Sequence, residues 1–251
     1  MGSKSHPLFI GKNMNIYKGI FADIPVSIGF HDQKAAEFFG NWLNQSNKNR
    51  YDVEVPQEHI DSWQKQWNLS DPAYSEYILS CSYICDYLMH YNRMVFHGAA
   101  FKWNDKAYLF TAPSGTGKTT QLRLWETLFP DEMTILNGDK PILEMKDHEM
   151  IVHPSPWKGK ENLGRDDITA PLGGIIFLRQ DKTNTIQKLS KSEAAGLLFG
   201  RSYTTFSTEK EVLMNADLLS NILESVPVWL LKNKGDSESA IMTHQTLTEE
   251  S

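Results

Sequence analysis

The distribution of apolar residues predicts alternating strands and helices over the C-terminal part of the chain. Short apolar runs bounded by turn residues indicate strands at 94–101, 107–111, 173–180 and 226–231. Apolar residues with helical spacing indicate helices at 118–129, 190–198, 208–224 and 237–247. The run 173–180 is almost continuously apolar, which is typical of a central strand covered on both faces. Asn104-Asp105 predicts a turn that joins the first two strands into a β-hairpin.

The first ninety or so residues have a mixed pattern that predicts a smaller α+β unit. Apolar positions between residues 8 and 30 indicate two short strands around a turn at Lys18-Gly19, and those between 32 and 46 have helical spacing. Asp71-Pro72 predicts a helix start, because an N-cap acid precedes a proline in the first turn. The run that follows predicts a long buried helix as far as about Arg93. We therefore expect two domains, at 1–92 and 93–251.

The stretch AYLFTAPSGTGKTT, at 107–120, places a strand, a glycine-containing loop and a helix start in direct succession. This is the context of a phosphate-binding loop, in which backbone N–H groups and the helix N-terminus hold phosphate oxygens. In such a loop Lys118 contacts the β- and γ-phosphates and Thr119 holds Mg²⁺. The consensus has glycine where this chain has Ala112, and the alternative is a chance Gly-Lys-Thr in a surface turn. The predicted nucleotide-binding residues are Pro113, Ser114, Gly115, Thr116, Gly117, Lys118, Thr119 and Thr120.

Phosphoryl transfer also needs a metal-binding carboxylate, a group that handles the acceptor's proton and further positive charge. Asp139 lies in the turn of a predicted strand–turn–strand at 134–145, where an acidic metal ligand is expected. His97 lies in the strand that pairs with the loop strand, and its imidazole can accept a proton. Three residues of a charged loop can face the γ-phosphate or the acceptor: Lys158, Lys160 and Glu161. The alternatives are a turn aspartate, a structural histidine and a solvated loop.

Composition narrows the class of protein. The 251 residues are 40% apolar and 22% charged, which is ordinary for a globular chain. The chain has 25 Lys and Arg against 31 Asp and Glu and no basic block, so we expect no nucleic-acid partner. It has no apolar run of about 18 residues and no apolar signal segment, so we expect a cytoplasmic protein without a membrane partner. Cys81 and Cys85 are expected to be buried thiols rather than zinc ligands.

Three segments together resemble the catalytic core of HPr kinase/phosphorylase: HGAA at 97–100, APSGTGKTT at 112–120 and LNGDK at 136–140. That family's loop reads S-G-x-G-K-[ST], which Ser114 to Thr119 match in full. The family shares its nucleotide fold with ATP-dependent phosphoenolpyruvate carboxykinase. The resemblance covers roughly residues 94–180, and it implies an α/β fold with a P-loop core of this type and a smaller N-terminal α+β unit.

The chain is more similar still to small HPr-kinase-like proteins found with peptide-tailoring enzymes, whose lasso-peptide members phosphorylate a serine of the precursor peptide. Their features include a loop like PWKGKE, here at 156–161, and a strand of the pattern P-L-x-x-I-x-F-L, here at 171–178. The resemblance implies ATP and Mg²⁺ as cofactors and transfer of the γ-phosphate to a serine hydroxyl of a peptide or protein. It also implies self-association, because HPr kinase forms hexamers. The roles it implies are phosphate binding for Lys118, Mg²⁺ binding for Thr119, metal ligand or base for Asp139, and active-site histidine for His97.

One departure from the family affects the mechanism. The HPr enzyme carries two adjacent aspartates at the end of its acidic strand, and this chain has Gly138-Asp139. The base is then Asp139 or His97. Two other functions stay open: a nucleotide-binding regulator without catalysis, and a kinase for a small molecule such as free serine.

Overall fold

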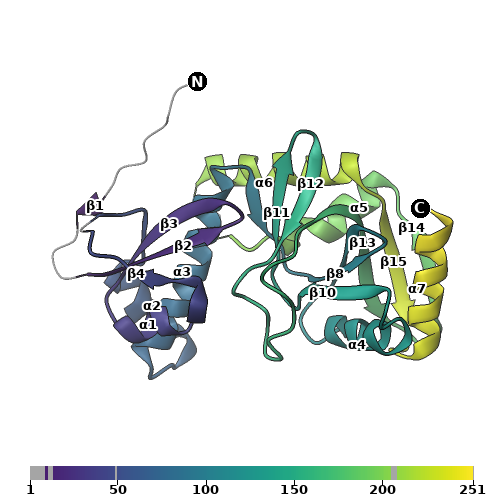
Figure 1. The fold of residues 1–251 in the computed structure, drawn as a ribbon, viewed down its shortest axis with the longest axis horizontal. Helices are drawn as coiled ribbons and strands as arrows, with labels where there is room; N and C mark the ends of the chain where they lie inside the picture. The colour runs from purple at the N-terminus through teal and green to yellow at the C-terminus, as the bar shows by residue number, and fades with distance from the viewer. Residues whose placement is uncertain (1–8, 11–13, 49, 205–207, 251) are drawn as a thin grey trace. The chain divides into compact units, whose positions relative to one another are not determined.

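The computed structural model describes residues 9–10, 14–48, 50–204 and 208–250 (Figure 1). The chain divides into two compact units. The N-terminal unit contains residues 1–91 with 204–207, and the C-terminal unit contains residues 92–203 with 208–251. In the described part of the chain, no helix combines the length and the hydrophobicity that crossing a bilayer requires.

The N-terminal unit is a small α+β fold. Its four-stranded sheet has the order β4-β2-β3-β6, with β2 at Asn15–Phe21, β3 at Ile24–Phe30, β4 at Asn44–Gln45 and β6 at Val53–Glu54. Two further strands pair with each other, β1 at Phe9–Ile10 and β5 at Arg50–Tyr51. The helices are α1 at Gln33–Glu37, α2 at Gln57–Trp67 and α3 at Pro72–Met89.

Two predictions for this unit were wrong, one for a hairpin turn and one for the length of a helix. The hairpin turns at Ala22-Asp23, where both residues adopt left-handed φ values of 46° and 65°, and Lys18-Gly19 lies within the paired strand. The helix predicted between 32 and 46 stops at Glu37, and a short 3₁₀ turn follows at Gly40–Trp42.

The long helix α3 was predicted correctly in place and type. The Asp71 carboxylate accepts hydrogen bonds from the backbone N–H groups of Ala73 and Tyr74, as an N-cap should. The helix buries Cys81 and Cys85, as expected. It ends at Met89 rather than near Arg93.

The C-terminal unit is built on a branched nine-stranded sheet. One arm has the order β10-β8-β9-β13-β15-β14, with β10 at Met133–Asn137, β8 at Ala99–Trp103, β9 at Lys106–Thr111, β13 at Ala170–Gln180, β15 at Val228–Asn233 and β14 at Thr185–Lys188. The start of β13 also pairs with a second arm, which contains β12 at Glu149–His153, β11 at Ile142–Lys146 and β7 at Arg93–Val95. The strand β13 runs parallel to β9 and β15, which confirms its predicted central place.

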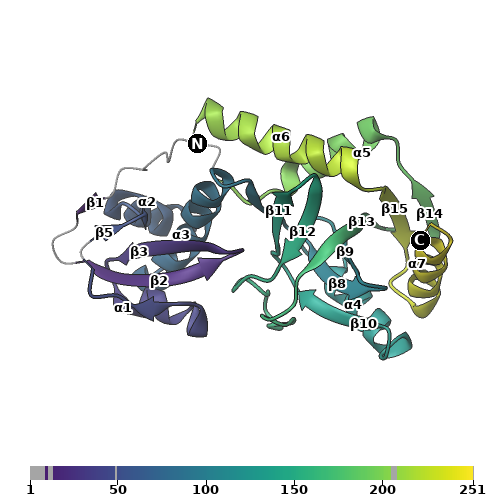
Figure 2. The same cartoon turned by 45° about the horizontal axis from the view of Figure 1, so that its top comes forward.

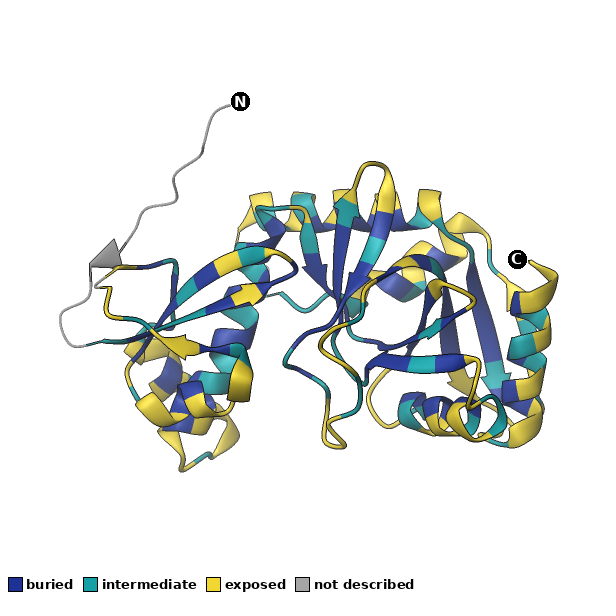
Figure 3. Cartoon of the chain, in the orientation of Figure 1, coloured by how far each residue is buried: buried dark blue, intermediate teal, exposed yellow. Residues whose placement is uncertain are grey.

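In the described part of this unit, the α-helices that pack on the sheet are α4 at Lys118–Leu128, α5 at Lys191–Leu198, α6 at Glu209–Ser225 and α7 at Ser237–Glu249. In Figures 1 and 2 the strands of the unit lie between α4 and α6. A buried aromatic cluster ties α4 to the sheet, with ring centroids 4.6 Å apart for Phe101 and Trp125 and 5.1 Å for Phe101 and Phe110. Figure 3 shows the strands of this core as mainly buried. The loop between β9 and α4 is therefore fixed at both ends.

The helices predicted at 190–198, 208–224 and 237–247 are present as α5, α6 and α7. Ser190 and Glu193 form the two reciprocal hydrogen bonds of a capping box at the start of α5. In α6, Leu219 and Ile222 are buried, whereas Val212 and Leu213 are exposed. The first turns of α6 therefore do not contribute their apolar residues to the core.

One strand prediction was wrong and one was confirmed: the single strand predicted at 94–101 is two strands, and the strand–turn–strand predicted at 134–145 is present. The run 94–101 divides into β7 and β8, which belong to different arms of the sheet, and the two strands of 134–145, β10 and β11, also belong to different arms. Residues 96–98 connect β7 to β8, and residues 138–141 connect β10 to β11. These two connecting segments lie side by side, because Phe96 N–H donates to the carbonyl of Pro141 (3.0 Å) and Gly98 N–H donates to that of Asp139 (2.9 Å). This arrangement brings His97 next to Asp139.

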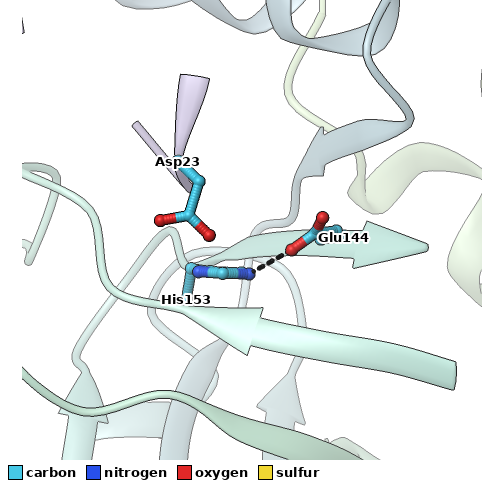
Figure 4. A group of neighbouring side chains, drawn as sticks. All are labelled: Asp23, Glu144 and His153. Carbon is cyan, nitrogen blue, oxygen red and sulfur yellow. Dashed lines mark hydrogen bonds and ion pairs between the residues drawn. The ribbon is translucent and has the colours of Figure 1, made fainter. Parts of the chain in front are cut away.

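A row of polar side chains joins the three strands of the second arm. The Glu144 carboxylate on β11 accepts hydrogen bonds from Arg93 on β7 (2.5 Å) and from Nε2 of His153 on β12 (2.7 Å; Figure 4). Glu144 lies directly opposite Arg93 in the strand register, so this is a cross-strand pair. These hydrogen bonds stabilise the second arm, whose strand β7 leads directly into the connecting segment 96–98.

Candidate active site

The loop between β9 and α4 has the backbone of an anion-binding turn. Gly115 and Gly117 adopt left-handed φ values of 78° and 112°, which glycine accommodates without a Cβ penalty. Gly117 is the N-cap of α4, and no side chain of the described residues caps this helix end. Its first N–H groups therefore stay available to a ligand, where the helix dipole favours negative charge.

Lys118 is the buried cation of the site, with only 8% of its surface exposed. Its Nζ donates to the carbonyl oxygen of Ala112 (3.2 Å) and lies 3.1 Å from Nε2 of His97. Burial lowers the pKa of the Lys118 ammonium; the carboxylate of Asp139 opposes that shift, and other nearby cations add to it. An ammonium placed in this way gains most when an anion enters the site.

His97 and Asp139 lie next to each other on the two connecting segments, 96–98 and 138–141. Nε2 of His97 lies 3.5 Å from Oδ1 of Asp139, and the Lys140 ammonium pairs with the same carboxylate. Burial would raise the pKa of Asp139, but the hydrogen bond from His97 and the charge of Lys140 outweigh it and lower the pKa to about 2. Asp139 is therefore an ionised carboxylate at neutral pH, suited to bind a cation and a poor proton acceptor.

These residues line one cavity of about 480 Å³ within the C-terminal unit. Its volume lies in the usual range for a small-molecule site. Most of the sequence-predicted residues contribute to the wall: His97, Ser114, Gly115, Gly117, Lys118, Thr119, Thr120, Asp139, Lys158, Lys160 and Glu161. Pro113 and Thr116 are outside it, and the Thr116 hydroxyl donates to the Pro113 carbonyl (2.9 Å), which closes the loop turn. Thr119 and Asp139, the two predicted metal ligands, thus share a cavity.

The three residues of the charged loop have different surroundings. Lys158 donates to the Gly164 carbonyl (3.0 Å) and pairs with Asp166 (2.8 Å), so its charge is used within the loop. Glu161 forms an ion pair with Arg123 on α4 (3.0 Å). Lys160 has no hydrogen bond or ion pair to other described residues, which makes it the loop cation best able to meet a ligand.

Two cations near the site were not among the predicted residues. Lys140 pairs with Asp139, and its ammonium lies 5.2 Å from the ring centroid of Tyr203. The Arg201 carbonyl accepts a hydrogen bond from His97 N–H (2.6 Å), and Nε of Arg201 is buried without a hydrogen-bond partner among the described residues. Lys140 follows Asp139 in the motif and could have been chosen, whereas no local pattern places Arg201 here.

Gly138 marks a close contact between the acidic turn and the charged loop. A Cβ at this position would lie 2.7 Å from the Lys158 carbonyl oxygen and 3.0 Å from Cβ of Leu163. The Gly138 N–H also donates to the Leu163 carbonyl (2.9 Å). The position that carries the first aspartate in the HPr enzyme has no room for a side chain here.

We expect Gly138→Ala to lower the free energy of unfolding by about 1–3 kcal/mol, because overpacking forces the loop away from the turn. Urea unfolding of the purified variant measures this. Gly196→Ala is the matched control, since a Cβ there would meet nothing within 4 Å and helix α5 favours alanine over glycine by about 0.5–1 kcal/mol. Equal stability of the wild type and Gly138→Ala would contradict the close contact.

The low pKa of Asp139 predicts a pH-dependent contribution to stability. Because its folded-state pKa of about 2 lies below the ordinary value of 3.8, the ionised carboxylate stabilises the fold above about pH 4. That contribution, about 2 kcal/mol, is lost as the pH falls through about 2. Urea unfolding should show Asp139→Asn less stable than the wild type at pH 7 and a gap that narrows below pH 4. A gap that is constant with pH would contradict the assignment.

Comparisons with known proteins add little to this geometry. No protein-family model matches the chain. The search of curated proteins gave no match either. Among solved structures, the chain is similar to the HPr(Ser) kinase/phosphatase from Coxiella burnetii, with 10% sequence identity, a TM-score of 0.35, and coverage of 62% of this chain and 92% of that chain.

Proposed function

We propose that the chain is an ATP-dependent phosphotransferase of the HPr kinase-like type, which transfers a phosphoryl group to a serine hydroxyl of a peptide or protein. The observation that carries this proposal is a single cavity lined by the phosphate-binding loop, Lys118, His97 and Asp139. The ribosomal precursor of a lasso-type peptide is the acceptor we favour, on the resemblance of the segments at 156–161 and 171–178.

The residues of the cavity fit ATP and Mg²⁺. The uncapped start of α4 and the Lys118 ammonium suit phosphate oxygens. The Thr119 hydroxyl and the ionised Asp139 carboxylate are oxygen ligands of the kind that Mg²⁺ takes, and both line the cavity. Bound Mg²⁺-ATP would supply the transferable phosphoryl group.

Each polar side chain of the site then has a role that follows from its surroundings. With a pKa of about 2, Asp139 suits cation binding better than proton transfer. That leaves the imidazole of His97, rather than the Asp139 carboxylate, to take the acceptor's proton, since imidazole is the common general base near neutral pH. Arg201 and Lys160 add positive charge near the cavity, which favours the transition state of phosphoryl transfer.

One specific observation favours a second function, that of a nucleotide-binding regulator without catalysis. Gly138 has no room for a second acid, and Asp139 is a weak base. A chain that kept only the phosphate-binding loop and one metal ligand would bind ATP without transferring phosphate. Binding and transfer therefore have to be measured separately.

The experiment incubates the purified chain with ATP, Mg²⁺ and a panel of serine-ended precursor peptides, each matched by a copy with alanine in place of serine. Mass spectrometry reads the gain of one phosphate, and calorimetry measures ATP affinity. Phosphate on the serine peptides alone supports the proposal. ATP binding without transfer supports the regulator, and transfer to free serine in a parallel reaction supports a small-molecule kinase. Failure to bind ATP contradicts all three.

A further inference from the structure

The last residue of β10 is a buried amide to which the roles above assign nothing. Asn137 has no exposed surface. Its Oδ1 accepts hydrogen bonds from the backbone N–H groups of Asp139 (2.9 Å) and Lys140 (2.8 Å). Its Nδ2 donates to the carbonyl oxygen of Ser155 (3.1 Å) and to the Ser155 hydroxyl (3.0 Å). A side-chain amide offers two donors and two lone pairs, so all of its capacity is used.

Ser155 completes the connection from the loop after β12, and it is also fully buried. Its hydroxyl donates to the Lys140 carbonyl (2.5 Å) and accepts from the backbone N–H of Trp157 (3.2 Å). The Lys140 N–H donates in addition to the Trp157 carbonyl (3.1 Å). The two side chains thus join the turn at 138–140 to the start of the loop that carries Lys158 and Lys160.

The turn held in this way carries the acid of the site. The backbone N–H of Asp139 is bound by Asn137, and its carbonyl accepts from the N–H of Gly98, the residue after His97. The carboxylate lies 3.5 Å from His97 and pairs with Lys140. Displacement of a catalytic group by about 1 Å can cost about 10² in rate, so anchoring this turn bears directly on catalysis.

The hydrogen bonding of Asn137 and Ser155 indicates that they position the backbone around them rather than fill space in the core. A buried polar group costs free energy unless it is fully hydrogen-bonded, and apolar side chains would fill the same space without that cost. At position 137 one side chain must accept from two N–H groups and donate to a carbonyl and a hydroxyl. Only a side-chain amide offers both.

We propose that Asn137 and Ser155 are positioning residues, which hold Asp139 and the following loop in place for the reaction of this site. The inference rests on the proposed function for its kinetic consequence. Its structural consequence, a rigid turn at Asp139, does not depend on any activity.

The test uses Ser155→Ala, which removes one hydroxyl, and Asn137→Asp, which keeps an acceptor but loses the donor to Ser155. We expect kcat to fall by about 10- to 100-fold in each, while KM for ATP changes by less than about threefold, because the phosphate-binding loop is untouched. Ser155→Cys keeps a weak donor and should recover part of the loss. Amide hydrogen exchange at Asp139 and Lys140 should be faster in both variants, in the absence of nucleotide as well.

Ser239→Ala is the matched control. Its hydroxyl is equally buried in the same unit, donates to the Asp236 carbonyl (2.6 Å) and accepts from Gln121 (2.7 Å). We expect it to lower stability about as much as Ser155→Ala, with kcat and the exchange at Asp139 unchanged. An equal loss of kcat in Ser239→Ala would reduce the pair to a structural role and overturn the inference.

The outcomes separate the two proposals. If the wild type transfers phosphate and Ser155→Ala is as active, the inference fails and the proposed function stands. If the wild type transfers no phosphate, the proposed function fails, and hydrogen exchange alone decides whether the pair holds the turn. Unchanged exchange at Asp139 in Ser155→Ala and in any folded Asn137→Asp overturns the inference in either case.

Discussion

Replacement of Lys118 by alanine should reduce phosphoryl transfer by about 10³-fold or more, because one preorganised charge on the transferred group is worth at least that factor. The Lys118 Nζ is already held by the Ala112 carbonyl and lies beside His97, so it needs little reorganisation to meet a phosphate. Transfer from γ-labelled ATP to the best serine peptide measures the effect. The loss should be seen in kcat and in ATP affinity together.

The same substitution should leave the fold intact. Burial disfavours the charged form of Lys118, so removing the ammonium also removes a desolvation cost. Lys118→Met keeps the apolar stem and should lose as much activity as Lys118→Ala. Lys106→Ala, at an exposed lysine of β9, is the surface control. Transfer within tenfold of the wild type in either Lys118 variant would rule out the site.

Asp139→Asn should lower kcat by about 10²- to 10³-fold, since an amide cannot replace a metal-binding carboxylate. The effect should depend on the metal. ATP binding without Mg²⁺ should be unchanged or tighter, because a negative charge has been removed, whereas the gain in affinity on adding Mg²⁺ should be lost. Calorimetric titrations of ATP with and without Mg²⁺ measure this directly.

An exposed acid, Asp167, provides the comparison for the partly buried Asp139. Asp167 forms a surface ion pair with Arg165 (2.8 Å), so Asp167→Asn should change neither kcat nor the response to Mg²⁺. Replacement of His97 by glutamine should lower kcat and leave the Mg²⁺ response in place. If Asp139→Asn kept the full gain in affinity on adding Mg²⁺, the carboxylate would not be a metal ligand.

Local patterns predicted the strands and helices of the C-terminal unit well, because an apolar run or a helical spacing of apolar residues can be recognised within a short stretch of sequence. The strand–loop–helix at 107–120 and the central strand β13 needed no long-range information. The partners of the strands were a different matter. An apolar run shows that a strand is buried and does not show which arm of a sheet it joins. The division of the predicted strand 94–101 into β7 and β8 was therefore missed, and the strands β10 and β11, although both predicted, could not be assigned to different arms.

The residues of the candidate site divide in the same way, into those that a local motif identifies and those that only the fold brings together. Lys118, Thr119 and Asp139 lie in recognisable segments, so the sequence named them. Arg201 lies near the site because its segment pairs with the one around His97, through the isolated bridge between Phe96 and Ser202 and the hydrogen bond from His97 N–H to the Arg201 carbonyl, and no local pattern encodes this pairing. Lys158 was named as a substrate contact, yet Asp166 and the Gly164 carbonyl already bind its ammonium, a competition visible only when the loop is folded.

The packing at Gly138 has a consequence for how sequences of this kind can vary. A side chain there and the present course of residues 158–163 cannot occur together in one chain, because the Lys158 carbonyl fills the volume. Substitutions at the two places should therefore be correlated among homologous sequences. A homologue with aspartate at this position should differ in the length or course of the opposing segment, and a graft of the acid alone should fail where a graft of both succeeds.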